Sequence, residues 1–375
     1  MRGLLLRVAG ICLGLASFGA AAAADYATRP ALPSAAPAQA QLTDIELAGE
    51  RLVIAGERGL IAWSEDQGRS WEQSRVPVSE TLTALSFPTS EHGWAVGHGG
   101  VILHSGDGGK SWQQQFDGND ANRQRLELAT KRMSALQATL ETASPDDKAD
   151  LEYELEEAQF AVEDAELAIE TGPADPFLDV WFADAQVGWA VGAYGMLFRT
   201  NNGGLQWRIA SAGIENIDGY HYYSLAASKS GQLYLSGEAG LLYRSDDGGD
   251  NWLRLPLDYD GSLFGVLAAG TDTVVCFGLR GNIFRSTDRG ETWASIEPSN
   301  NANLSFYGGK LLTERRMVVV GAGGVMTSSS DAGETFVSDV HSARSTFSSV
   351  VEIDGDLLLT GMEGLVRIPH SRSDR

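Results

Sequence analysis

The chain has 375 residues, a formal net charge of −22, and 44 glycines, and only 9% of its residues are aromatic. A surface this acidic is expected to repel nucleic acid and anionic lipid surfaces, and it favours either solubility or a basic partner. The length permits two or three ordinary domains or one closed β structure, and the frequent glycines indicate many turns.

The first 24 residues predict a secretory signal peptide. Arg2 and Arg7 come first, an apolar stretch follows at 8–18, and a run of alanines ends at Ala24. This layout is typical of a leader that is cleaved after small residues, and its apolar stretch is short for a membrane anchor. We therefore expect cleavage near Ala24 and a mature protein in the periplasm.

After the leader, one pattern occurs seven times with a period of about 40 residues. A full copy has an apolar strand, a second strand ending in Gly-x-x-Gly, a third strand, and a polar turn that leads into a fourth. Such periods are typical of propeller blades, so the sequence predicts an all-β, seven-bladed β-propeller. The glycine pairs are Gly56/Gly59, Gly97/Gly100, Gly192/Gly195, Gly237/Gly240, Gly278/Gly281, Gly321/Gly324 and Gly361/Gly364.

Six of the polar turns match the Asp-box, Ser/Thr-x-Asp-x-Gly-x-x-Trp, with small variations. The short polar side chain is expected to hydrogen-bond the backbone amides of its own turn, while glycine supplies the positive φ. We interpret these residues as structural rather than catalytic or calcium-binding. They are Asp66, Asp107, Asn202, Asp247, Asp288 and Asp331.

The repeats divide the propeller into 25–118, with blades 1 and 2, and 172–375, with blades 3 to 7. The seventh copy stops at Pro369 without an Asp-box or a fourth strand, and this would leave an unpaired strand edge. We predict that Tyr26–Leu32 supplies the missing outer strand and closes the ring.

Residues 119–171 interrupt the repeats and predict an antiparallel α-helical hairpin with one narrow seam. Ser144, followed by Pro145, is the expected N-cap of the second helix. Apolar residues recur at intervals of three and four along both helices. The expected seam residues are Leu126, Ala129, Met133, Leu136, Leu140, Leu151, Leu155, Ala158, Val162, Ala165 and Ile169.

The second half of the hairpin is strongly acidic, with eleven carboxylates against Lys148. Two interpretations remain: a solvated helix face, or a docking arm that binds a basic patch on a partner. Because the insertion leaves from a connection between blades, we expect it to rise from the face of the disc that carries the Gly-x-x-Gly turns. Each helix reaches roughly 30–40 Å.

The Gly-x-x-Gly turns and the nearby starts of the inner strands predict a partner-binding rim at one end of the channel. Its mixture of polar and aromatic side chains suits a peptide or protein. The aromatic run at 220–223 fits ordinary packing between blades equally well. The candidate rim residues are Arg58, His98, Tyr194, Tyr222, Glu238, Arg280 and Glu363.

Metal and nucleophile chemistry have weak support in the sequence, and we expect neither a metal nor a cofactor. His92, His98 and His104 are evenly spaced, but successive turns of a blade alternate between opposite faces of the disc, so the three cannot share one ion. Cys276, the single cysteine after leader removal, lies in an apolar strand and is interpreted as a buried, inert thiol.

The motif Gly-Trp-Ala-Val-Gly, at 93–97 and again at 188–192, precedes an Asp-box in both places. This combination resembles the photosystem II assembly and stability factor family, in its exported bacterial branch, over the mature chain except 119–171. The resemblance implies a propeller without enzymatic activity that helps to assemble a membrane protein complex. For exported relatives it suggests an export transporter of the resistance-nodulation-division type. The arginine patch expected of photosystem factors is reduced here to Arg58 and Arg280.

A sialidase-like glycoside hydrolase or a carbohydrate-binding propeller is the alternative. Asp-boxes also occur in sialidases, and Arg367-Ile368-Pro369 resembles one of their signatures, although it lies in the last blade instead of near the first. Glycoside hydrolysis needs two carboxylates about 5–9.5 Å apart. Glu57, Glu238 and Glu363 are the candidates on the rim.

Overall fold

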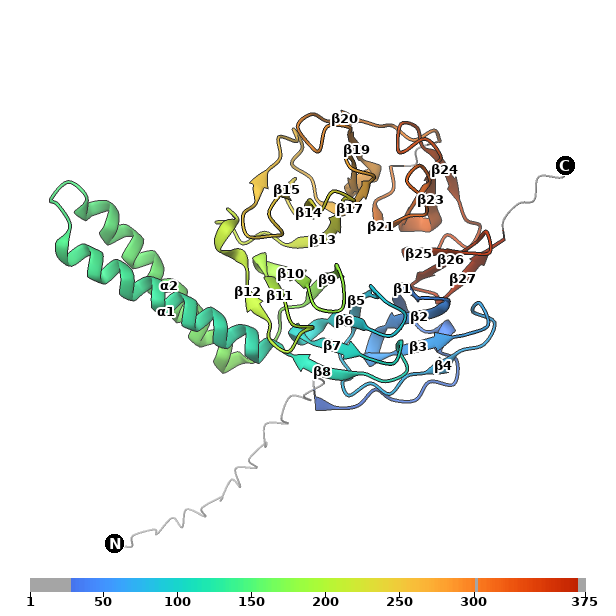
Figure 1. Ribbon diagram of the computed structural model, residues 1–375, viewed down its shortest axis with the longest axis horizontal. Helices are drawn as coiled ribbons and strands as arrows, with labels where there is room; N and C mark the ends of the chain where they lie inside the picture. The colour runs from blue at the N-terminus through green and yellow to red at the C-terminus, as the bar shows by residue number, and fades with distance from the viewer. Residues whose placement is uncertain (1–27, 301–302, 370–375) are drawn as a thin grey trace, which may run out of the picture.

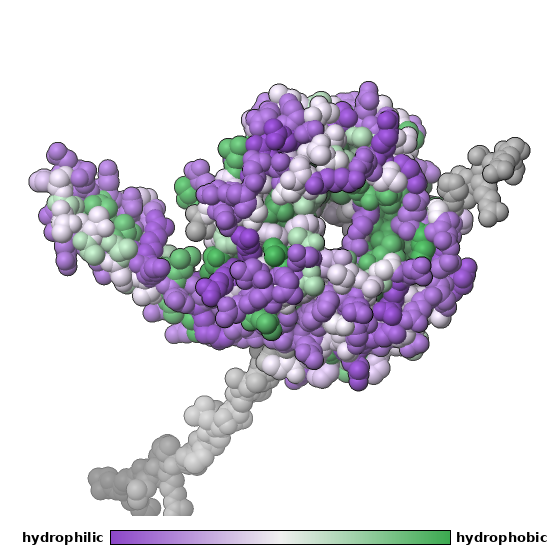
Figure 2. Space-filling model, in the orientation of Figure 1, coloured by the Kyte–Doolittle hydropathy of each residue, from purple (hydrophilic) through white to green (hydrophobic). Residues whose placement is uncertain are grey.

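The computed structural model describes residues 28–300 and 303–369, so the predicted leader at 1–24 lies outside the described part. Seven antiparallel sheets form a ring, and a helical hairpin extends from its edge (Figure 1). Figure 2 shows the central channel open through the disc. The predicted seven-bladed propeller with an inserted helical hairpin is therefore confirmed.

Each blade is a meander whose first strand lines the channel and packs beside the first strands of its neighbours. The inner strands are β1 (Leu42–Ala48), β5 (Leu82–Ser86), β9 (Phe177–Phe182), β13 (Tyr222–Ala227), β17 (Leu263–Ala269), β21 (Phe306–Leu311) and β25 (Phe347–Ile353). The second strands are β2 (Arg51–Gly56), β6 (Gly93–Gly97), β10 (Gly188–Gly192), β14 (Leu233–Gly237), β18 (Thr273–Gly278), β22 (Met317–Gly321) and β26 (Asp356–Gly361).

The outer half of blades 1 to 6 carries the Asp-box between the third and fourth strands. The third strands are β3 (Ile61–Ser64), β7 (Ile102–Ser105), β11 (Leu197–Thr200), β15 (Leu242–Ser245), β19 (Ile283–Ser286), β23 (Val325–Ser329) and β27 (Val366–Ile368). The fourth strands are β4 (Glu72–Gln73), β8 (Gln113–Phe116), β12 (Arg208–Ile209), β16 (Leu253–Arg254), β20 (Ala294–Ser295) and β24 (Val337–Val340).

The hydrophobic core lies between neighbouring blades, with one cluster at each of the seven junctions. Second strands such as β6 and β10 are buried along their whole length because a blade packs against each face. This explains the Gly-Trp-Ala-Val-Gly motif. Trp94 stacks on Phe182 of the next blade with ring centroids 3.5 Å apart, and a Cβ on Gly188 would lie 2.5 Å from that same ring.

The Asp-boxes bind their own turns. In blade 5, the Asp288 carboxylate accepts hydrogen bonds from the Ser286 hydroxyl at 2.7 Å and from the Thr292 amide at 2.9 Å. The Ser286 hydroxyl accepts the Gly290 amide at 2.8 Å, and Trp293 donates to the Gly290 carbonyl at 3.0 Å. These bonds complete a compact turn without any ligand.

The predicted closing strand is wrong for the residues that the structure describes. Residues 28–32 form no strand, and β27 is the edge of a three-stranded sheet. The Ala31 amide donates to the Val76 carbonyl at 3.1 Å, and the Gln73 side chain donates to the Leu32 carbonyl at 2.9 Å, so this segment is tied to blade 1. The ring closes instead by packing of β1 against β25 and β26.

The hairpin consists of α1 (Gly118–Thr142) and α2 (Lys148–Thr171). Asp117 caps α1 through the amides of Asn119 and Asp120. The prediction that Ser144 caps α2 is wrong, because α2 begins later; Ser144 instead bonds the side chain of Asp147, the residue at the N-cap position, at 2.7 Å. Neither helix is long and apolar enough to cross a membrane.

The seam between the helices follows the predicted residues until its last turn. Ala158 and Ala165 are buried in it, but Ile169 is exposed and Ala168 takes its place. A straight helix drifts about 20° per heptad against a seven-residue repeat, which moves Ile169 out of the seam.

The direction of the hairpin also differs from the expectation. The hairpin begins beside the turn at His98–Gly100 but then runs outward from the edge of the disc instead of rising from its face (Figure 1). Gln124 of α1 holds it there by bonding both the Trp207 carbonyl and the Ile209 amide at the exposed edge of blade 3. The hairpin thereby covers part of an open strand edge.

Candidate partner-binding face and central channel

In blades 1 to 6, the Gly-x-x-Gly turns hold their second central residue in a left-handed conformation. Blades 2 and 6 have glycine at this position, but blades 1, 3 and 5 have Arg58, Tyr194 and Arg280, with φ values of 56°, 52° and 58°. A non-glycine residue in this conformation costs about 1–2 kcal/mol. All three side chains are exposed, with Tyr194 at 62%. The face therefore carries two arginines and a tyrosine at positions where glycine would relieve strain.

The structure separates the predicted rim residues into two groups. Tyr222 is fully buried between blades 3 and 4, where its ring packs edge-on against Tyr243, so its assignment to the rim was wrong. Side chains alternate along a strand, so His221 and Tyr223 point to the opposite side of the strand from Tyr222. The remaining six are exposed or half-buried on the turns: Arg58, His98, Tyr194, Glu238, Arg280 and Glu363.

Five rings form an aromatic arc, which we define as Tyr194, His221, Tyr223, Phe264 and Tyr307. Their successive centroid distances are 4.8, 6.2, 5.0 and 5.4 Å. The arc runs from the turn of blade 3 along the inner strands of blades 4, 5 and 6. The alternation after Tyr222 would have placed His221 and Tyr223 correctly, whereas the contacts between different blades are visible only in the folded chain.

Hydrogen bonds fix the outer end of the arc. His221 Nδ1 accepts the Tyr194 amide at 3.1 Å, which leaves the proton of the neutral ring on Nε2. The His221 amide donates to Glu238 Oε2 at 3.3 Å. Burial, and then the charge of Glu238, raises the pKa of Tyr223, so its hydroxyl stays protonated. The arc thus offers apolar ring faces together with polar groups at its rim.

The channel below the arc contains a cavity of about 450 Å³. Its mouth is uneven, because the second residue of each inner strand differs between blades. Blades 4, 5 and 6 contribute aromatic rings, and the other blades contribute smaller side chains. These smaller residues are Thr43, Thr83, Leu178 and Ser348.

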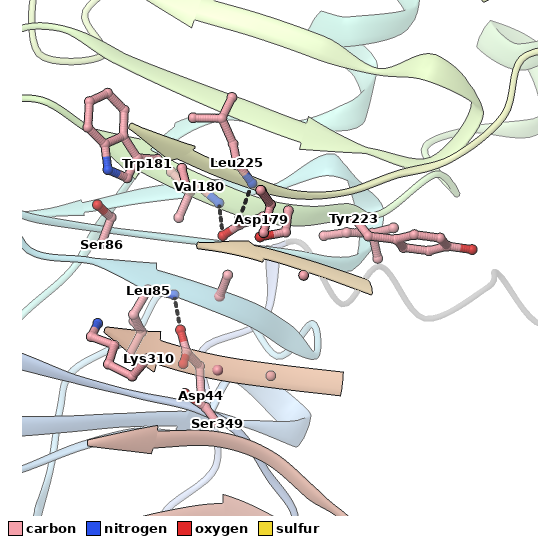
Figure 3. Close-up of a pocket in the computed structure, with 18 of the residues that line it drawn as sticks. Asp44, Leu85, Ser86, Asp179, Val180, Trp181, Tyr223, Leu225, Lys310 and Ser349 are labelled. Carbon is pink, nitrogen blue, oxygen red and sulfur yellow. Dashed lines mark hydrogen bonds between the residues drawn. The ribbon is translucent and has the colours of Figure 1, made fainter. Parts of the chain in front are cut away.

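Two carboxylates line this cavity and join neighbouring blades (Figure 3). Asp44 accepts the Ile45 amide at 2.8 Å and the Leu85 amide of blade 2 at 2.7 Å. Asp179 accepts the Val180 amide and the Leu225 amide of blade 4, both at 2.8 Å. Burial raises the pKa of Asp44 to about 7, with a further contribution from the Glu46 charge, and burial raises the pKa of Asp179 to about 6.

Lys310 of blade 6 is the cationic side chain in the lining of this cavity. It forms an ion pair with Glu46 of blade 1 on the other side of the channel. Burial lowers the pKa of Lys310, but Glu46, Asp44 and Asp179 together outweigh burial and raise it. Three carboxyl groups therefore face one ammonium. This balance favours a positively charged group of a ligand in the channel.

The remaining candidates lie apart from the channel. His92 Nδ1 and His104 Nε2 are 3.1 Å apart, and the two rings stack beside Trp94. His98 lies on the turn at the other face of the disc. Cys276 is buried, and burial raises the pKa of its thiol. Across the described residues, no group of three or more His, Cys, Asp or Glu is arranged to hold a metal ion.

Comparison with protein families gives one matching model, described as "Photosynthesis system II assembly factor YCF48", over residues 67–130 and 158–304. The stretch between the two matched segments, 131–157, is the distal part of the hairpin.

Curated relatives are similar over part of their length. A "Photosystem II assembly lipoprotein Ycf48" of Synechococcus sp. (strain CC9902) is 31% identical over 128 residues, which is 33% of this chain and 38% of the relative. The "Photosystem II stability/assembly factor HCF136, chloroplastic" of Oryza sativa subsp. japonica is 27% identical over 142 residues, 36% of this chain and 34% of the relative. The matched stretch therefore spans a little over a third of these relatives.

Solved structures share the fold. "YCF48 bound to D1 peptide" has a TM-score of 0.60 at 18% identity and covers 90% of this chain and 98% of that chain. YCF48 from Cyanidioschyzon merolae has a TM-score of 0.60 at 15% identity, with the same coverage. A GH74 enzyme of Niastella koreensis has a TM-score of 0.58 at 12% identity over 88% of this chain and 52% of its own.

Proposed function

Because the chain belongs to the family of the photosynthesis system II assembly factor YCF48, we propose that it is a non-enzymatic binding factor for a membrane protein complex. In this proposal, an extended segment of one subunit lies across the aromatic arc at the mouth of the channel. The periplasm is the proposed compartment. An export transporter of the resistance-nodulation-division type is the proposed complex.

The aromatic arc is the observation that carries this proposal. Five rings in a continuous row, with Tyr194 and Tyr307 exposed at its ends, provide the large, rigid contact area that is typical of binding hot spots. Folding alone does not require Tyr194 at a strained position, since blades 2 and 6 form the same turn with glycine. A binding role explains why this side chain is retained.

The chemistry of the channel adds a preference for the bound segment. Apolar or aromatic side chains of the segment would pack on the arc, while a lysine or arginine would enter the acidic cavity beside Asp44 and Asp179. One solved structure with this fold is YCF48 bound to a D1 peptide, so in that protein the propeller binds a peptide. This chain shares the fold of that relative and carries its own aromatic arc, and both support peptide binding.

The test is crosslinking of the mature protein to intact envelopes, followed by purification and mass spectrometry. Tyr194→Ala and Tyr307→Ala are expected to reduce recovery of one membrane complex by at least fivefold. Leu205→Ala is the matched control, because Leu205 is an exposed apolar residue in an Asp-box turn, on the other face. Equal recovery with all three variants would refute the binding role of the arc. Recovery of a different complex would refute the transporter assignment alone.

Glycoside hydrolysis is the second candidate, and one observation favours it. Asp44 and Asp179 line a cavity with raised pKa values, as a catalytic acid would. However, one oxygen of each carboxylate accepts the amide of the next residue in its own strand, and the other accepts an amide of the neighbouring blade, so a structural role accounts for both groups. The enzyme hypothesis requires turnover of a glycoside that Asp44→Asn or Asp179→Asn abolishes in a folded protein. Absence of turnover across a broad glycoside panel would end it.

A further inference from the structure

The base of the hairpin holds α1 and α2 in a fixed direction. The Arg125 guanidinium pairs with Asp175 in the return segment at 2.8 Å, and the Asn122 amide donates to the Ala168 carbonyl of α2 at 2.9 Å. Gln124 bonds the edge of blade 3. Because these contacts join both helices to the propeller, the distal turns are presented outward at one angle (Figure 1).

Three large apolar residues form a stripe on the side of α2 that faces away from α1. Tyr153, Phe160 and Leu167 follow one another at intervals of seven residues and are 64%, 56% and 57% exposed. Seven residues make nearly two turns, so the side chains lie in one row about 20 Å long. A solvated helix face would be polar at these positions. Figure 2 shows hydrophobic patches among hydrophilic ones along the hairpin.

Carboxylates border this stripe on both sides. Glu156 and Glu163 lie on one flank, and Glu157 and Asp164 lie on the other, three or four residues from the stripe. The whole of α2 has nine acidic residues against one lysine. An apolar row between two acidic rows matches a helix that carries an apolar row between basic residues.

Other occupants fit this surface poorly. A second copy that paired α2 with α2 would bring the two acidic flanks together, and pairing of α2 with the α1 of another copy would give an open chain instead of a closed dimer. An anionic lipid surface would be repelled by the same carboxylates.

We propose that the stripe of Tyr153, Phe160 and Leu167 binds a basic amphipathic helix of the partner protein, as a third helix beside α2. The proposal rests on the proposed binding function and adds a second contact to it. The aromatic arc holds an extended segment, and the stripe holds a helix. Because the two surfaces lie on different parts of the molecule, an experiment can refute one binding proposal without refuting the other.

The first test uses a fluorescent 18-residue peptide with leucines on one helical face and lysines on both flanks. Binding to the mature protein is measured by anisotropy, beside a scrambled peptide of the same composition and an analogue with glutamate in place of lysine. The combined change Tyr153→Gln, Phe160→Gln and Leu167→Gln is expected to weaken binding of the amphipathic peptide at least tenfold. These side chains are exposed, so the helix content by circular dichroism should remain.

Matched controls separate the stripe from general attraction to an acidic protein. Leu128→Gln changes an exposed leucine of α1, and Leu205→Ala changes an exposed leucine of an Asp-box turn; both are expected to bind the peptide like wild type. Unchanged affinity in the stripe variant, or equal binding of the scrambled peptide, would overturn the proposal. Stripe-dependent self-association in sedimentation, or stripe-dependent binding to phosphatidylglycerol vesicles, would also overturn it.

The second test places a photocrosslinking residue at Phe160 in the full chain in cells. The crosslinked segment, identified by mass spectrometry, is expected to be a helix with lysine or arginine on both sides of an apolar row. A crosslink to a segment without that pattern would refute the assignment of the occupant. If the arc variants retain the complex while this crosslink persists, the arc proposal fails and the stripe proposal stands.

Discussion

Replacement of Asp44 by asparagine should change how the stability of the propeller depends on pH. In the folded chain, burial and the neighbouring Glu46 charge raise the pKa of Asp44 from 3.8 to about 7, while Ser349, the Leu85 amide and Lys310 oppose this shift. The unfolded chain therefore loses this proton at lower pH than the folded chain. The stabilising effect of the protonated carboxyl is complete below pH 3.8 and is lost as pH rises through 7.

The two pKa values set the size of the effect. Between pH 5 and pH 8, a carboxyl with a pKa of 3.8 unfolded and about 7 folded lowers the free energy of unfolding by about 2.5 kcal/mol. Asp44 lines an open channel and is only half-buried, so water in the channel reduces this to about 1–2.5 kcal/mol. A comparison of wild type with Asp44→Asn at one fixed pH is not informative, because the asparagine side chain accepts one of the two amides at every pH.

The assay is urea unfolding at pH 5, 6, 7 and 8 and constant ionic strength, followed by tryptophan fluorescence. The free energy of unfolding of wild type minus that of Asp44→Asn should fall by about 1–2.5 kcal/mol from pH 5 to pH 8. Asp179→Asn should show the same sign, with the change nearly complete by pH 7, because the pKa of Asp179 is about 6. Asp260→Asn, at an exposed position, is the control. A difference that is independent of pH for Asp44→Asn would refute this account of the channel.

Three further predictions concern the fold. Gly188→Ala should destabilise the propeller by about 1–3 kcal/mol, because its Cβ would lie against the Phe182 ring. Gly106→Ala, whose Cβ would lie 3.9 Å from the His104 ring in ordinary van der Waals contact, should change little in the same urea titration. Deletion of 119–171 should leave a cooperatively folding propeller, because Gly118 already lies beside Pro173; loss of cooperative thermal unfolding would contradict this. Asp288→Ala should lower the thermal midpoint at pH 7. That difference should shrink from pH 4 to pH 2, because bonds from Thr292 and Ser286 lower the pKa of Asp288 to about 2; a difference that persists undiminished at pH 2 would contradict it.

Elements that depend on residues close together in the chain could be predicted from the sequence. The Gly-x-x-Gly turns, the Asp-boxes and the helical periodicity at 119–171 each depend on residues that are near in sequence. Each pattern therefore predicts its own element, and seven copies of one four-stranded pattern leave little choice besides a ring of blades.

Errors arose where a distant group decided the outcome. The path of 28–32 depends on the Gln73 side chain, which donates to this segment, and on the Val76 carbonyl, which accepts from it. The direction of the hairpin depends on the open edge of blade 3 at Trp207 and Ile209. Tyr222 was placed on the rim because its strand begins there, although the one-residue alternation of a strand buries it between two blades.

By itself, the sequence determined the repeat, the number of blades, the turn chemistry and the presence of an acidic helical hairpin, because these follow from spacing along the chain. Only the tertiary structure decided that rings from four blades meet as the aromatic arc and that Asp44, Asp179, Glu46 and Lys310 face one cavity. Asp44 and Lys310, for example, are 266 positions apart in the sequence. Closure of the ring brings them together, and no local pattern records which side chains will meet across a channel.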